Sequence, residues 1–165
     1  MEKPIIELRN IKHAAFASKE THCYSATIYV DGKKWGTVSN DGRGGCDNVN
    51  PITGGYQAVQ DLNSRIANTY PKSEFVGDIT MDMDLEVICS DLVNDFLMMK
   101  SFKKQMKRIT YFKNGQKGLY DLPTKYAPTS ERIAFLKAKA AWAKGVTFLQ
   151  DLPENEAFAA FKKNA

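Results

Sequence analysis

The chain of 165 residues lacks a long hydrophobic run, and its longest apolar stretch, Ala157 to Phe161, has five residues. A membrane-spanning helix needs about 20, so the sequence predicts no contact with a membrane. The chain has only three cysteines and two histidines. Because three thiols cannot all pair with one another, we expect reduced cysteines and no disulfide framework. The first residues do not have the pattern of a secretory signal, and we expect a cytoplasmic protein.

Glycine (11 residues) and proline (6 residues) are too few for a collagen-like or low-complexity chain. Hydrophobic residues make up 43% of the sequence and charged residues 25%. This composition is typical of a folded globular protein rather than a disordered one. The length fits one domain of about 100–200 residues. We therefore expect a single domain over residues 1–165, with two subdomains at 1–107 and 108–165.

Charge is distributed unevenly along the chain, although the formal total is only +4. Residues 74–95 include seven acidic residues and no basic one, and residues 100–117 include seven basic residues and no acidic one. In one helix this order is stabilised by the helix dipole. Alternatively, the basic residues bind the phosphates of a nucleic acid. The candidate contacts are Lys103, Lys104, Lys107, Arg108, Lys113 and Lys117.

The first half of the sequence combines expected strands with two expected helices. Residues 5–16, 25–30 and 34–39 have strand-like patterns, and Asp31-Gly32 predicts a tight hairpin turn between the second and third. Apolar residues then recur at helical spacing over 55–70 and over 84–106. The second of these helices is apolar over a wide face, and we expect it to be the central core helix. We interpret residues 72–83 as a connection.

The second half predicts a further hairpin, a short strand and two more helices. Asn114-Gly115 separates two short strand-like segments, and Ser130 begins a helix that we expect to reach Trp142. A short strand at 146–149 precedes a last helix at 154–162. The elements do not alternate as in a doubly wound sheet. The order therefore predicts an α+β fold, with antiparallel strands, a meander and a second hairpin, and about four helices packed on them.

The densest group of polar residues is Ser39-Asn-Asp-Gly-Arg-Gly-Gly-Cys-Asp47. Glycines let the backbone present N–H groups to an anion, and an arginine binds phosphate in a forked geometry. The sequence contains neither a dinucleotide-binding fingerprint nor a Walker motif here. One interpretation is a site for a nucleotide-like ligand, and the other is a tight connection whose glycines serve only the turn. The candidate ligand-binding residues are Asn40, Asp41, Arg43, Gly44, Gly45 and Asp47.

Three other chemistries draw on residues of the same region or of the second hairpin. A zinc site could use members of the set His13, His22, Cys23, Asp41, Cys46 and Asp47, but the characteristic ligand spacings are missing. A cysteine nucleophile could pair with His22. Aromatic residues near lysines could form a stacking platform for a single strand; they are Tyr111, Phe112 and Tyr120. We expect no metal, no cofactor and no catalytic residue.

The segment from Tyr24 to Cys46, with its Asn-Asp-Gly-Arg-Gly-Gly motif, resembles a family of small proteins found in bacteriophage and plasmid genomes. Similar features of that family are a helix like Asp91 to Phe96 and tail segments like 117–120 and 149–153. The family has no established activity, and its usual variant has histidine at the position of Arg43. The resemblance implies an accessory protein of a mobile element that acts in a bacterial host.

These observations favour a binding protein over an enzyme. We expect a host-takeover or counter-defence factor that inhibits a host protein or captures a nucleotide-like small molecule. A nucleic-acid-binding protein that uses residues 100–117 is one alternative. A phosphoesterase-like enzyme that uses Asp41 and Asp47 is the other. The sequence does not distinguish among the three.

Overall fold

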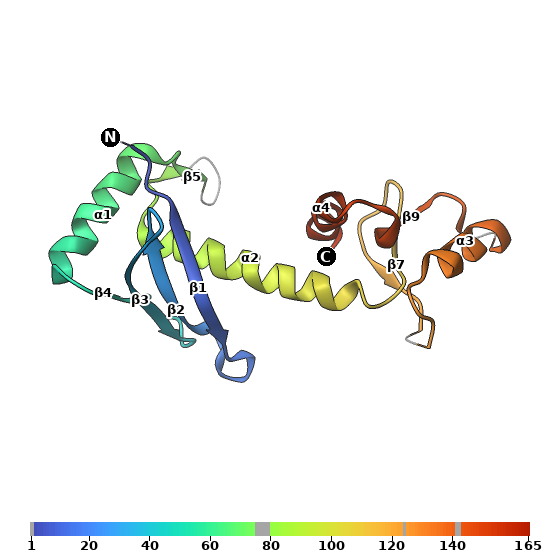
Figure 1. Cartoon of the computed structure of the whole chain (residues 1–165), viewed down its shortest axis with the longest axis horizontal. Helices are drawn as coiled ribbons and strands as arrows, with labels where there is room; N and C mark the ends of the chain where they lie inside the picture. Colours follow the sequence, from blue (N-terminus) through green and yellow to red (C-terminus); the bar gives the residue numbers. More distant parts are fainter. Residues whose placement is uncertain (1, 75–79, 124, 141–142) are drawn as a thin grey trace. The chain divides into compact units, whose positions relative to one another are not determined.

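The computed structural model describes residues 2–74, 80–123, 125–140 and 143–165 (Figure 1). The chain divides into two compact units, Met1–Asn94 and Asp95–Ala165. This division falls inside a long helix, whereas the sequence-based boundary at Arg108 follows that helix. Both units combine helices with antiparallel strands, which confirms the α+β class, and the described residues form four α-helices as expected. Within these residues, no helix is both long and apolar enough to span a membrane.

The first unit is built on an antiparallel sheet of four strands in chain order: β1 (Ile6–His13), β2 (Cys23–Val30), β3 (Lys33–Asp41) and β4 (Asn48–Pro51). The Asp-Gly pair forms the predicted turn between β2 and β3. Asp31 and Gly32 have φ angles of 51° and 76° there, as a type I′ turn requires. The sequence analysis missed β4, because asparagine and proline are poor strand residues. Its edge position, paired only with β3, tolerates them.

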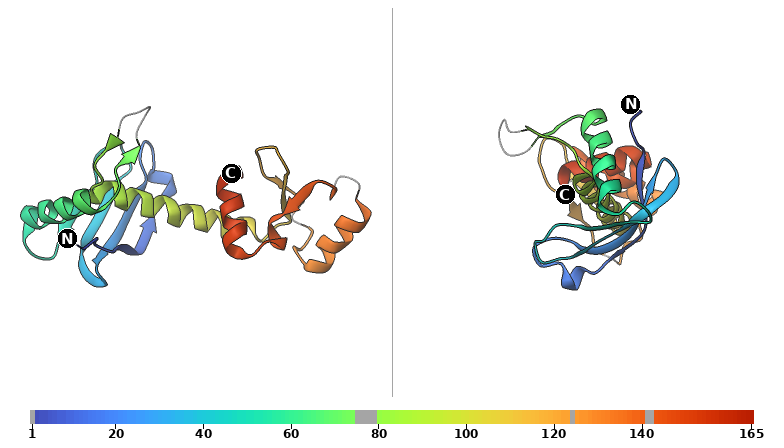
Figure 2. Two further views of the ribbon diagram at one scale, coloured as in Figure 1. Left: turned by 90° about the horizontal axis from the view of Figure 1, so that it is seen from above. Right: turned by 90° about the vertical axis from the view of Figure 1, so that its left-hand side faces the viewer.

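Two helices cover one face of this sheet. Figure 2 shows α1 (Gly55–Thr69) and the first part of α2 (Leu85–Gln105) on the same side. Ile28 and Val38 from the sheet, Ile66 from α1 and Val93 from α2 are all at most 1% exposed. This packing confirms the amphipathic pattern predicted for α1. In α2, expected as the central core helix, the buried residues of the first turns are Leu85, Ile88, Cys89 and Val93. Tyr56 is an exception, since it was expected on the buried side of α1 and is 77% exposed.

The segment before α2 is more structured than the connection predicted from its sequence. It contains the short paired strands β5 (Ser73–Glu74) and β6 (Thr80–Met81); residues 75–79 between them lie outside the described residues. The Asp84 side chain then accepts a hydrogen bond from the Val87 amide at 2.8 Å. This contact caps the start of α2, where a carboxylate also interacts favourably with the helix dipole.

The second unit has a sheet of three short strands in the order β8 (Tyr120–Asp121), β7 (Thr110–Lys113), β9 (Val146–Phe148). This arrangement confirms the predicted second hairpin and the short later strand. The helical elements are α3 (Ser130–Lys139), the 3₁₀ turn η3 (Leu149–Asp151) and α4 (Glu154–Asn164). The side chain that caps α3 belongs to Thr129, one residue before the expected Ser130. Trp142, the predicted end of this helix, lies outside the described residues.

The second unit has two small hydrophobic clusters on opposite sides of β7. Phe102 at the end of α2 packs with Phe158 and Phe161 of α4, at ring distances of 5.3 and 5.6 Å. The other cluster joins Ile109 and Phe148 to α3. Adjacent residues of β7 serve the two clusters, because successive side chains of a strand point to opposite faces.

Candidate functional site

The glycine-rich segment Asn40–Asp47, here called the glycine loop, is organised by the side chain of Asn40. Its Oδ1 accepts hydrogen bonds from the Thr21 hydroxyl and the Gly42 amide, both at 2.8 Å. Its Nδ2 donates to the Gly45 carbonyl at 2.9 Å and to Asp47 Oδ1 at 3.0 Å. All four hydrogen-bonding positions of this side chain are therefore used within the protein.

The backbone amides of the loop are also largely used within the protein. Besides Gly42, the amide of Arg43 donates to Asp41 Oδ1 at 3.2 Å and that of Gly44 donates to Thr21 Oγ1 at 3.3 Å. The Asp47 amide donates to Glu86 Oε1 at 3.0 Å. A phosphate-binding nest requires several amides directed at the ligand. These four amides are not available for that purpose, so they support the turn interpretation rather than the nest.

Gly42 joins the glycine loop to the β1–β2 connection. Its carbonyl accepts from the amides of Lys19 and Glu20 at 2.9 and 3.0 Å. A Cβ atom on Gly42 would lie 2.4 Å from the Ala17 carbonyl oxygen, and its φ of +81° also favours glycine. The two segments thus touch through their backbones, with no room for a side chain at this point.

Two exposed residues flank this contact in sequence, Phe16 and Arg43, and we call the pair the aromatic tip. Phe16 lies in the 3₁₀ turn η1 (Ala15–Ala17) and is 93% exposed. Arg43 is exposed and has no side-chain hydrogen bond or ion pair to any described residue. Each residue is one position away from the contact between Ala17 and Gly42. The sequence analysis did not single out Phe16, because exposure of one aromatic residue leaves no pattern.

Asp47, the second predicted aspartate, is held in the wall of a small polar cavity of about 100 Å³. Its carboxylate accepts from the Tyr24 hydroxyl and from Asn40. Burial and the nearby Asp47 raise the pKa of Tyr24 well above its usual range. The described residues include no group of three or more His, Cys, Asp or Glu side chains that could hold a metal. Asp41 accepts from the Arg43 amide, so both aspartates accept hydrogen bonds from neighbouring residues.

The two units differ strongly in net charge. The first has nine Lys and Arg residues against thirteen Asp and Glu residues, and the second has fourteen against six. Formal charges of −4 and +8 are thus concealed in the total of +4. A charge of +8 on a unit of this size attracts polyanions over a distance of several ångströms. The second unit is therefore the electrostatic candidate for a nucleic-acid interface.

The second unit has a basic groove along one face of α2 and just beyond its end, here called the lysine groove. It has a volume of about 480 Å³ and is lined by Phe96, Met99, Lys100, Lys103, Lys104 and Lys107. Spacings of three and four residues place these side chains on one side of the helix. None of the four lysines forms an ion pair with a described residue. Phe96, which the apolar pattern assigned to the core, is 38% exposed here.

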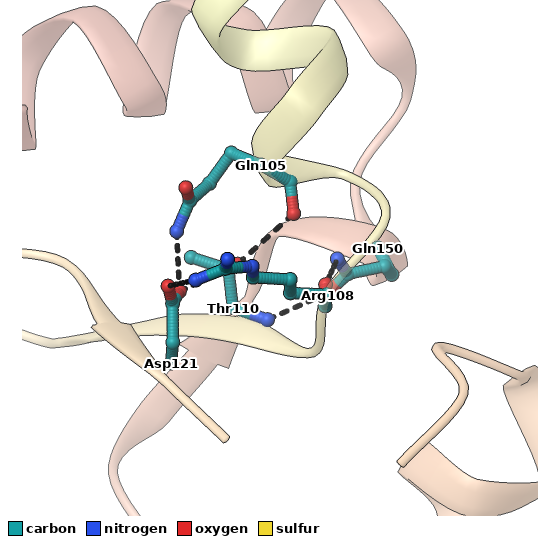
Figure 3. A network of polar contacts seen from close by, with 5 residues as sticks. All are labelled: Gln105, Arg108, Thr110, Asp121 and Gln150. Atoms are coloured by element: carbon teal, nitrogen blue, oxygen red, sulfur yellow. Dashed lines mark hydrogen bonds and ion pairs between the residues drawn. The ribbon is translucent and has the colours of Figure 1, made fainter. Parts of the chain in front are cut away.

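Arg108, another predicted contact, serves the structure of the second unit instead. Its guanidinium lies 3.4 Å from Asp121, which also accepts from Gln105 and from the buried Thr110 hydroxyl (Figure 3). Gln150 accepts from the Thr110 amide at 3.3 Å and donates to the Arg108 carbonyl. This network fixes the turn that joins α2 to β7.

The remaining predicted contacts lie on the β7–β8 hairpin. Lys113 and Lys117 line a separate pocket with Phe112 and are not in the lysine groove. Tyr111 stacks on Tyr120, with ring centroids 5.5 Å apart and planes inclined by 18°. Phe112 packs against the Phe102 cluster. The three aromatic residues therefore do not form the single continuous platform considered from the sequence.

Comparison with known proteins assigns no family. No protein-family model, curated protein or solved structure matches the chain. The resemblance to phage and plasmid proteins therefore stays a prediction. Function has to be inferred from the geometry of the glycine loop, the aromatic tip and the lysine groove.

Proposed function

We propose that the protein binds nucleic acid through the lysine groove of its second unit. The observation that carries this proposal is a row of four lysines with no acidic partner among the described residues, on one helix face beside two apolar side chains that form the floor of the groove. Like charges at helical spacings of three and four destabilise a helix. A row of phosphates relieves this repulsion and releases counterions when it binds.

The floor of the groove favours single-stranded over double-stranded nucleic acid. Phe96 and Met99 line the groove at the N-terminal end of the lysine row, and phosphates gain nothing from contact with apolar side chains. Unpaired bases do gain, because base stacking on an aromatic ring contributes about 1–3 kcal/mol per base. In a duplex the faces of the bases are already stacked within the helix and cannot reach such a floor.

The direct test is fluorescence anisotropy with a single-stranded oligothymidine and with a duplex of the same length, between about 50 and 200 mM salt. Replacing Lys100, Lys103, Lys104 and Lys107 by glutamine should abolish tight binding. For single strands, the slope of log K against log salt concentration is about −0.7 per phosphate contact. Removing four contacts should therefore make this slope less negative by about 3. Binding that survives this replacement, or no binding even at low salt, would contradict the proposal.

A matched control separates the groove from overall charge. Replacing Lys12, Lys19, Lys33 and Lys34 by glutamine removes four exposed charges from the first unit. This control should change affinity only slightly. Phe96→Ala tests the floor of the groove and should remove the preference for single strands. Phe135→Ala, at a residue that is 55% exposed on α3, should leave that preference intact.

A second candidate function, capture of a host protein, is favoured by the aromatic tip. Aromatic residues and arginine are the commonest energetic centres of protein interfaces. Here both project from segments that hydrogen bonds hold in place, which lowers the entropy lost on binding. A counter-defence or host-takeover factor of a mobile element would use such a tip to mask a host component in the bacterial cytosol.

Affinity purification from bacterial cytosol tests this second function. The wild-type protein should retain a partner that Phe16→Ala and Arg43→Gln each lose, and the purified partner should reproduce the difference. Ile52→Ala, which removes another exposed apolar side chain of the first unit, is the control. Equal retention by all four proteins would exclude the tip as the binding surface.

A further inference from the structure

A second basic cavity lies between the β7–β8 turn and α4, both of the second unit. Its volume of about 520 Å³ is within the range of small-molecule sites. Six of its lining residues concern the argument: Phe112, Lys113, Gln116, Lys117, Lys163 and Asn164. We call this cavity the hairpin pocket.

Three lysines line the hairpin pocket, and no carboxylate does. None of them forms an ion pair with a residue in the described ranges. The adjacent Lys162 gives the contrast, because its ammonium lies 2.6 Å from Asp95. The Lys113 ammonium lies 5.1 Å from the centre of the Tyr120 ring, so the uncompensated positive charges available to a ligand in the pocket are those of Lys117 and Lys163. The complementary ligand carries several negative charges in a compact group. A di- or triphosphate has this property.

The rest of the lining suits a planar, hydrogen-bonding group. Phe112 is half-buried against the Phe102 cluster, so its ring has a fixed position in the wall. Asn164 is 9% exposed, and its amide is oriented by a hydrogen bond of 2.8 Å to the Ala160 carbonyl. An aromatic wall beside amide side chains can stack a nucleobase and bind its polar edge.

The pocket is also held in place on its hairpin side. Gly115 has a φ of 81°, and the Gln116 amide donates to the Lys113 carbonyl at 3.1 Å, which closes the turn. The Asn114 amide donates to the Gly145 carbonyl at 3.2 Å. Lys117 thus directly follows a fixed turn, and less conformational entropy is lost when a ligand binds.

We propose that the hairpin pocket binds a nucleoside di- or triphosphate, with the phosphates between Lys117 and Lys163 and the base against Phe112. The site is distinct from the lysine groove. The sequence analysis expected a nucleotide-like ligand at the glycine loop, whereas this proposal places it in the hairpin pocket. The same chemistry is present in a free nucleotide and in the phosphorylated 5′ end of a strand.

Isothermal titration of the full chain with ATP and with inorganic triphosphate tests the proposal. Replacing Lys117 and Lys163 by glutamine should weaken ATP binding by about tenfold or more, because charge-assisted contacts are lost. The matched control replaces Lys139 and Lys144, which are exposed outside the pocket, and should change affinity less than about twofold. Equal weakening by both double variants, or no heat with ATP at low salt, would overturn the proposal.

Further measurements test which part of the nucleotide is bound and distinguish the hairpin pocket from the lysine groove. Phe112→Leu should bring the affinity for ATP down to that for inorganic triphosphate; equal affinities in the wild type would overturn the role of the base. A 5′-triphosphorylated oligonucleotide that competes with ATP would show that a strand end also fits, whereas an unphosphorylated one should not compete. The variant with four glutamines in the lysine groove should keep its ATP affinity. The two proposals can therefore be confirmed or contradicted independently.

Discussion

The polar groups of the glycine loop in the first unit and the lysines of the two cavities in the second unit have opposite roles. In the glycine loop of the first unit, the Asn40 side chain and four backbone amides form hydrogen bonds within the protein. In the second unit, the lysines of the groove and of the hairpin pocket have no acidic partner among the residues that the structure describes. Groups that are satisfied internally stabilise the fold. Charges that are left uncompensated are the ones available to a ligand.

The largest effect on stability should come from Gly42→Ala in the first unit. The new Cβ would overlap the Ala17 carbonyl, and alanine is strained at a φ of +81°. We expect a loss of about 2–5 kcal/mol in the free energy of unfolding, measured by urea denaturation. Gly45→Ala is the control, because a Cβ there meets no atom within 4 Å. A tolerated Gly42→Ala would show that the loop is not a structural clamp.

The fold was largely predictable from the sequence because its local signals are strong. The Asp31-Gly32 and Asn114-Gly115 pairs predict the two main hairpins, and the apolar spacing predicts α1 and α2 within a few residues. The strand β4 was not predictable, since an edge strand of asparagine and proline is stabilised only by its pairing with β3. Its existence depends on tertiary structure rather than on local preference.

The candidate sites were predictable only in part. The basic run drew attention to residues 100–117, but sequence alone could not show that Asp121 neutralises Arg108 while Lys103 and Lys104 stay unpaired. The spacing of Phe96 from Lys100, Lys103 and Lys107 was visible in the sequence. It was interpreted as the apolar face of a core helix, because periodicity alone does not distinguish a buried face from an exposed one.

In the second unit, Asp121→Ala should have the next largest effect on the free energy of unfolding. The substitution leaves the Gln105, Arg108 and Thr110 side chains without their shared acceptor (Figure 3). We expect a loss of about 1–3 kcal/mol in the free energy of unfolding. Asp95→Asn, which breaks only the exposed pair with Lys162, should cost less than about 1 kcal/mol. Equal losses would mean that the network contributes no more than a surface ion pair.

Alkaline pH should weaken the first unit through Cys89. Burial raises the pKa of this thiol from 9.0 to about 12 in the folded protein. Its contribution to stability is therefore complete below pH 9 and falls as the pH rises from 9 to 12. At pH 10 Cys89 alone should account for a loss of about 1.4 kcal/mol relative to pH 7, obtained from urea denaturation of the wild type and of Cys89→Ala at each pH. Cys89→Ala should show a smaller decline, and Cys46→Ala, at an exposed thiol, should decline like the wild type.

The smallest effect on stability should come from Arg43→Gln. This substitution tests whether the backbone of the glycine loop stabilises the fold without help from the Arg43 guanidinium. The Arg43 amide is bonded to Asp41, whereas no described residue binds its guanidinium. A substitution that keeps the backbone should therefore change the free energy of unfolding by less than about 0.5 kcal/mol. A larger loss in urea denaturation would show that Arg43 supports the fold. A negligible loss, together with loss of the partner retained by the wild type, would mean that Arg43 acts in binding alone.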